Sequence, residues 1–126
     1  MAGELILRTN KVVNQTTGTN QLQVDDSGGI FSNYGAAGNV VYRLPALCPV
    51  GLEFTFCLQE SEYIEILTPA SGSLLYYDDS TGNHLNGLRA TTEGHTCTIV
   101  CLDGTSGAEV FMVTSVIGST WTTAFE

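Results

Sequence analysis

The stretch FSNYGAAGNVVYRLPALCPVGLEFTFCL, from Phe31 to Leu58, decides the fold of this chain. Every second residue is apolar on both sides of a loop that holds Pro45 and Pro49. Because successive side chains of a strand point to opposite faces, this alternation predicts two half-buried strands. The prolines lack the N–H that a strand ladder requires, so the loop predicts a corner. We expect the apolar side chains of this strand, corner and strand to build the core: Val40, Tyr42, Leu44, Leu52, Phe54, Phe56 and Leu58.

The rest of the chain continues the strand pattern. Ile64 and Ile66 alternate with other residues and are predicted to point inward, while Asn86-Gly87 and Asp103-Gly104 are typical of tight turns. No window shows the apolar stripe of an amphipathic helix. The sequence predicts an all-β fold, a single antiparallel β-sandwich or barrel-like domain, and alternation does not decide between these two. The further strands are predicted over residues 62–67, 74–77, 88–90, 96–102 and 110–117.

Residues 1–29 differ in composition from the rest of the chain. They are rich in Thr, Asn, Gln and Gly, and their alternation is weak. This predicts an extended N-terminal arm with short strand pieces, followed by a β-domain over residues 30–126. Such an arm can bind a neighbouring subunit by strand addition. Its apolar residues are therefore predicted to contact a partner: Leu5, Ile6, Leu7, Val12 and Val13.

Charge excludes several classes of function. The net charge is −9, and only four residues are Lys or Arg, so nucleic-acid binding is not expected. Charged residues make up 13% of the chain, against about 25% in an average soluble protein, which suits a surface shared with partners. No apolar run approaches the ~20 residues that cross a membrane, and the start of the chain does not resemble a secretion signal. Neither nucleic acid nor membrane is a predicted partner.

No catalytic, cofactor or metal site is predicted. A hydrolase needs a nucleophile with its base, but His84 and His95 lie in polar loops, and no serine stands in a nucleophile elbow. The run from Asp78 to His84 superficially resembles a calcium loop, yet it lacks the acidic spacing and the terminal glutamate. Four cysteines are expected to be reduced and buried: Cys48, Cys57, Cys97 and Cys101.

Three aromatic residues offer a different kind of site. Tyr76, Tyr77 and Trp121 are predicted to bind a partner, either at a protein interface or by stacking on sugars. Aromatic residues in strands also serve in the core, and the sequence leaves that alternative open.

Several motifs together resemble a β-rich module of tailed-bacteriophage virion proteins. They are FSNYGAAGNVVYRLP (Phe31 to Pro45), GLEFTF (Gly51 to Phe56), IEI (Ile64 to Ile66) and GSTW (Gly118 to Trp121). The resemblance lies in the order of these motifs and extends over residues 30 to 122. The module often carries a tryptophan in its last long strand, where this chain has Phe111.

This resemblance implies a non-enzymatic virion structural protein. A small, acidic, all-β chain with an N-terminal arm favours a capsid decoration (cement) protein on the capsid exterior, assembled in the host cytoplasm. Such a protein bridges subunits of the major capsid protein and associates with itself, typically as a homotrimer. The alternative is a phage tail, baseplate or fibre component with a receptor- or glycan-binding role. We expect the contacts to come from the arm and the later loops rather than from the Phe31–Leu58 stretch.

Overall fold

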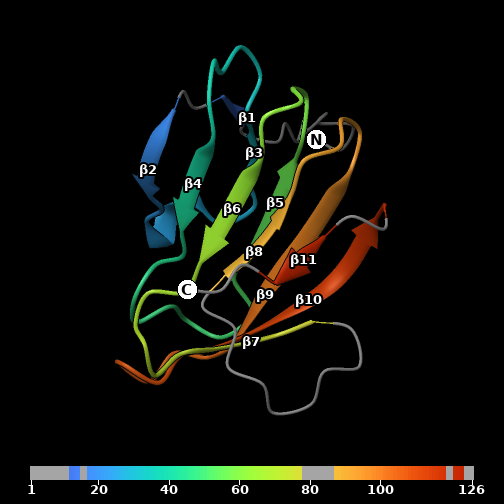
Figure 1. The fold of residues 1–126 in the computed structure, drawn as a ribbon. Helices are drawn as coiled ribbons and strands as arrows, with labels where there is room; N and C mark the ends of the chain where they lie inside the picture. The colour runs from blue at the N-terminus through green and yellow to red at the C-terminus, as the bar shows by residue number, and fades with distance from the viewer. Residues whose placement is uncertain (1–11, 15–16, 78–86, 119–120, 124–126) are drawn as a thin grey trace, which may run out of the picture.

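The computed structural model describes residues 12–14, 17–77, 87–118 and 121–123, which form two β-sheets (Figure 1). One short 3-10 helix, η1 (Val24–Asp26), accompanies them. The all-β prediction is confirmed. The six-stranded sheet has the order β1 (Val12–Asn14), β3 (Ile30–Ser32), β5 (Glu53–Cys57), β9 (Thr96–Asp103), β10 (Val110–Ile117) and β7 (Leu74–Tyr76). The five-stranded sheet has the order β11 (Thr122–Thr123), β8 (Gly87–Ala90), β6 (Ile64–Leu67), β4 (Val40–Arg43) and β2 (Gly18–Gln21).

The prediction of an antiparallel domain is wrong, because both sheets are mixed. Neighbours β1, β3 and β5 are parallel, as are β2, β4 and β6, and β7 is parallel to β10. The remaining pairs are antiparallel, among them the β9–β10 hairpin. From β1 to β6 the chain passes to the opposite sheet after every strand. Each passage reverses its direction, so strands that follow one another within a sheet run the same way.

Four aromatic rings join the two sheets at the centre of the core. Tyr42 of β4 lies 5.5 Å from the ring centroids of both Phe31 and Phe56, which belong to the opposite sheet. Phe54 lies 6.3 Å from Phe31. The Tyr42 hydroxyl donates a hydrogen bond of 2.6 Å to the carbonyl oxygen of Ser32. The two predicted strands, β4 and β5, therefore face each other across the core, and the corner carries the chain from one sheet to the other.

Most of the predicted inward positions are confirmed. Val40, Tyr42, Leu44, Phe54, Phe56 and Leu58 are buried, as are Ile64 and Ile66, while Leu52 is partly buried against the core. The four cysteines are free, and three of them are buried. Cys57 is the exception, because it sits on the outer side of β5.

The predicted N-terminal arm is not confirmed by the described residues. Strands β1 and β2 form the outermost strands of the two sheets, in parallel register with β3 and β4. Leu22, which comes directly after β2, is buried in the core. The described residues 12–14 and 17–29 therefore belong to the same domain as the rest. Residues 1–11, with Leu5, Ile6 and Leu7, lie outside the described residues.

The aromatic cluster gives a direct test of the core. Replacing Phe56 by alanine removes a fully buried ring that contacts Phe31 and Tyr42. The Phe56→Ala variant is expected to lower the free energy of unfolding by about 3–5 kcal/mol, measured by urea denaturation. Exposed Tyr34 provides the control, since Tyr34→Ala should change the free energy by less than about 0.5 kcal/mol. Equal effects of the two substitutions would contradict the placement of Phe56.

Candidate interaction surfaces

The outer side of the six-stranded sheet is almost free of charge. Its side chains alternate along each strand with those that enter the core. Two carboxylates lie along the described strands of this sheet: Glu53 at the start of β5, and Asp103 at the end of β9, which is exposed and pairs with Val110. Ladder partners across the middle include Thr55 with Thr98, whose hydroxyl oxygens lie 3.0 Å apart. We call this surface the uncharged face: Val12, Ile30, Thr55, Thr98, Val100, Met112, Ser115, Ile117, Leu74 and Tyr76.

Large apolar side chains on the uncharged face are open to solvent. Met112 is 40% exposed and Ile117 is 62% exposed, both on β10. The outer side of the five-stranded sheet differs, because it carries Arg43, Glu65 and Arg89. The Arg89 guanidinium lies 4.9 Å from the ring centroid of Tyr63. Basic side chains thus lie on the outer side of the five-stranded sheet, whereas the middle of the other surface is made mainly of threonine and aliphatic residues, as in many interfaces.

Two predicted contact residues lie on the uncharged face. Val12 is on the edge strand β1 and Tyr76 is on the opposite edge strand β7, each in register with an outward neighbour. Val13 points the other way and packs against the core. The fold therefore places two positions that are distant in the sequence on the same surface, at its opposite edges.

The prediction that Trp121 contacts a partner is corrected. Its side chain is only 2% exposed, and its indole Nε1 donates a hydrogen bond of 3.0 Å to the carbonyl oxygen of Thr96. Burial with a satisfied N–H places the ring in the core, where no sugar can stack on it. This removes the tryptophan on which a glycan platform would depend.

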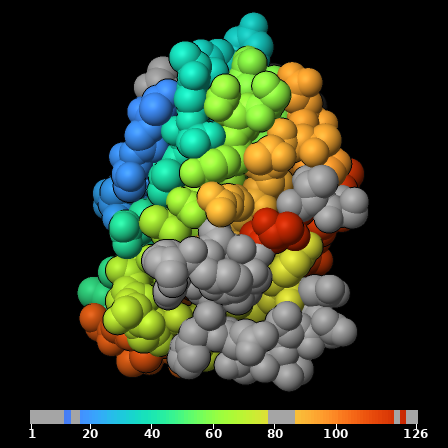
Figure 2. Space-filling view, viewed as in Figure 1, coloured from blue at the N-terminus to red at the C-terminus, as the bar shows by residue number. Residues whose placement is uncertain are grey.

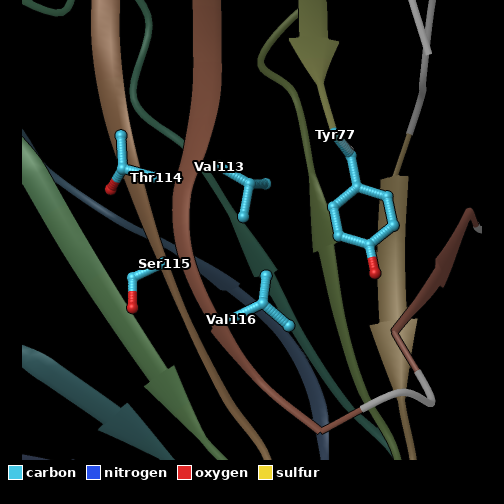
Figure 3. Close-up of a pocket in the computed structure, with 5 residues that line it drawn as sticks. All are labelled: Tyr77, Val113, Thr114, Ser115 and Val116. Atoms are coloured by element: carbon cyan, nitrogen blue, oxygen red, sulfur yellow. The ribbon is translucent and has the colours of Figure 1, made fainter. Parts of the chain in front are cut away.

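Tyr77 borders a groove beside β10. The ring faces Val113 and Val116, while Thr114 and Ser115 lie on the other side of the strand (Figure 3). The groove encloses about 280 Å³, and the Tyr77 hydroxyl donates a hydrogen bond of 3.2 Å to the carbonyl oxygen of Trp121. Tyr77 is thus tied to the fold next to the core rather than projecting as a free ring.

A second apolar surface lies on the corner loop, residues 44–52. Leu47 and Val50 are 63% and 69% exposed, and we call this pair the corner tip. Leu47 has a φ of 53°, a left-handed conformation that costs a non-glycine residue about 1–2 kcal/mol. The sequence interpretation assigned this stretch to the core and missed the tip. The available signal was PALCPV, the loop segment from Pro45 to Val50. It contains two prolines and no charged or amide side chain, which is unusual for an exposed loop.

A buried carboxylate holds the corner loop in place. Glu109 is completely buried, and its Oε2 accepts a hydrogen bond of 3.1 Å from the backbone N–H of Leu47. Its Oε1 accepts one of 2.7 Å from the hydroxyl of Ser73, which is also fully buried. Glu109 thereby fastens the corner loop to the turns at 68–73 and 103–109, which lie side by side at the lower left of the molecule (Figure 2). No pattern in the sequence indicates that this glutamate is buried.

Close backbone packing reinforces the same region. A Cβ atom at Gly104 would overlap the carbonyl oxygen of Cys48, and a Cβ at Gly72 would overlap that of Gly107. The Cys101 thiol donates a hydrogen bond of 3.0 Å to the same Cys48 carbonyl. Glycine is therefore required at both positions, and the corner loop is fixed from two sides.

The environment of the cysteine thiols determines their protonation. Burial raises the pKa of the Cys48 thiol to about 12 and also raises the pKa of Cys57, Cys97 and Cys101, so these thiols stay protonated. In the described ranges no three His, Cys, Asp or Glu side chains gather as a metal site, and no helix has the length and apolarity to cross a membrane. The run from Asp78 to His84 lies outside these ranges.

The pH dependence of stability tests the role of Glu109. Burial opposes ionisation of its carboxyl, yet hydrogen bonds from Ser73 and from backbone N–H groups outweigh burial and lower its pKa below the ordinary value of 4.5. The ionised carboxylate therefore stabilises the fold above pH 4.5, and this contribution is lost as the pH falls through the folded-state pKa.

We expect Glu109→Gln to lower the free energy of unfolding by about 1–3 kcal/mol near neutral pH, with a difference from wild type that shrinks as the pH falls below 4.5. Urea denaturation across this pH range measures it. The exposed control Glu53→Gln should show no such trend. A Glu109→Gln deficit that stays constant across the range would contradict the assignment.

A scan against protein-family models and a search of curated proteins find no match to this sequence. The functional interpretation therefore rests on the residues and surfaces of this chain.

Proposed function

We propose that this chain is a capsid decoration protein of a tailed bacteriophage. It is a non-enzymatic virion component on the capsid exterior that binds the assembled head and bridges subunits of the major capsid protein. The order of motifs from Phe31 to Trp121 and the all-β fold support this proposal. The observation that carries it is the uncharged face, because a broad apolar sheet surface on an acidic chain is suited to permanent assembly.

The partner on the uncharged face is a second copy of this chain. With a net charge of −9, two copies repel one another wherever their carboxylates meet. A contact through the uncharged face brings together mainly threonine and aliphatic side chains, with Glu53 and Asp103 as the carboxylates on its strands, so the repulsion is smaller there than elsewhere on the acidic surface. When the uncharged face of each copy contacts two neighbours around a three-fold axis, the contacts close as the homotrimer that the resemblance implies.

An oligomer binds the capsid shell more tightly than a single copy does, because it contacts several capsid subunits at once. Each copy presents the same contact, so attachment of one subunit holds the others near their sites and raises their effective concentration. Many modest contacts then oppose the internal pressure of packaged DNA. We also infer that the two sheets form a sandwich rather than a closed barrel, because no ladder joins them among the described strands.

Self-association is tested by placing a charge on the uncharged face. The Met112→Glu variant adds a carboxylate at an exposed position of β10, where a copy of itself would face a like charge. We expect wild type to sediment as an oligomer. The dissociation constant of the Met112→Glu oligomer should be at least about tenfold higher than that of wild type. Analytical ultracentrifugation measures both.

Thr19→Glu provides the matched control. Thr19 is exposed on β2, at the edge of the five-stranded sheet, so the same added charge should leave the oligomer intact. A monomeric wild type, or equal dissociation of both variants, would refute self-association through the uncharged face.

Binding to phage heads tests the wider proposal. Expanded heads that lack this chain are expected to bind the purified protein at many sites and then to retain DNA to a higher temperature. Co-sedimentation and the temperature at which DNA becomes accessible to a dye measure the two effects. Heads that neither bind the protein nor gain thermal resistance would show that the chain is not a decoration protein.

A further inference from the structure

We propose that the corner tip, Leu47 with Val50, is the anchor by which this chain docks into an apolar pocket bordered by Lys and Arg on the major capsid protein. This inference rests on the proposed function and names the contact surface that the function requires. The tip is separate from the uncharged face, since it lies on the loop between the sheets and not on the strands.

The corner tip is fixed before any partner arrives. Glu109 holds the backbone of Leu47, and the N–H of Gly51 donates a hydrogen bond of 2.8 Å to the carbonyl oxygen of Cys101 on β9. The thiol of Cys101 in turn holds the Cys48 carbonyl. A loop tied at three points loses little conformational entropy on binding, which favours affinity.

The conformation of Leu47 points to binding rather than stability. A left-handed backbone favours glycine, yet the chain places there a leucine whose side chain is directed into solvent. The side chain contributes little to the core and makes the backbone conformation less favourable. Strain of this kind, at an exposed residue held by its surroundings, is a mark of a functional site.

Charges around the corner tip specify the partner. The loops at this end of the molecule, residues 22–29, 44–52, 68–73 and 103–109, contain no Lys or Arg. The nearby cation is Arg43 at the end of β4, whose guanidinium donates a hydrogen bond of 3.4 Å to the carbonyl oxygen of Thr68. Exposed carboxylates at Asp25, Glu53 and Asp103 stand on these loops or at the strand ends beside them. Hydrogen bonds from the hydroxyl and N–H of Thr105 lower the pKa of Asp103, which keeps it ionised. An apolar tip among carboxylates complements an apolar pocket among basic residues.

A shallow hollow extends the apolar surface beside the tip. It encloses about 270 Å³ between the segment 21–24 and the corner loop. Val24, Pro45, Ala46 and Pro69 line it, together with the polar Gln21 and Gln23. The partner therefore meets a projecting pair of side chains next to a recess, a shape that selects one orientation of docking.

The test compares head binding by tip variants with that of wild type. Leu47→Gly removes the side chain and relieves the left-handed strain, so its Tm should fall by no more than about 2 °C or should rise. Its affinity for expanded heads that lack this chain should nevertheless fall about 10- to 100-fold. Val50→Ser should weaken binding in the same direction. Tyr34→Ser, at an exposed position in the loop at the other end of β4, is the matched control and should bind as wild type does.

The carboxylates are tested separately. The Asp25→Asn/Glu53→Gln double variant should associate with heads more slowly at low salt and show a weaker dependence on ionic strength. If Leu47→Gly binds heads as tightly as wild type does, the corner tip is not the docking anchor, while the proposed function still stands. Failure of wild type itself to bind heads would overturn both.

Discussion

The hydrogen bond between the buried Glu109 carboxylate and the backbone of Leu47 fixes the point where the chain crosses from the five-stranded sheet to the six-stranded one. Strands β4 and β5 on either side of this crossing supply Tyr42 and Phe56, whose rings meet in the core. The same carboxylate binds Ser73, so it also positions the turn before β7. One ionised group thus aligns both sheets at this end and presents two exposed apolar side chains.

Passage between the sheets after each early strand has a consequence for the surface. Each sheet receives its strands from different parts of the chain, so its outer side collects residues that are distant in sequence. On the six-stranded sheet these are mainly threonine and aliphatic side chains, whereas Arg43, Glu65 and Arg89 gather on the other. A chain of high negative charge thereby keeps most of one broad face uncharged, and the proposed assembly with copies of itself depends on this face.

Alternation in the sequence predicted the strands and their inward faces well, because burial on one side imposes a period of two. It could not predict parallel pairing, since the period does not record which strand lies alongside. Trp121 was assigned to a contact surface because nothing in the sequence shows that its indole N–H meets the Thr96 carbonyl. Glu109 and Leu47 were missed for a similar reason. Their significance comes from one hydrogen bond between loops far apart in the chain, and no local pattern encodes it.

We propose that many copies of this chain cover a phage head, and the copy number per virion tests this most directly. Quantitative mass spectrometry of purified virions, with the major capsid protein as the internal standard, measures the copy number directly. A decoration protein is expected in a fixed ratio to the major capsid protein, at hundreds of copies per particle. A handful of copies per particle would contradict this account and assign the chain to the tail or baseplate.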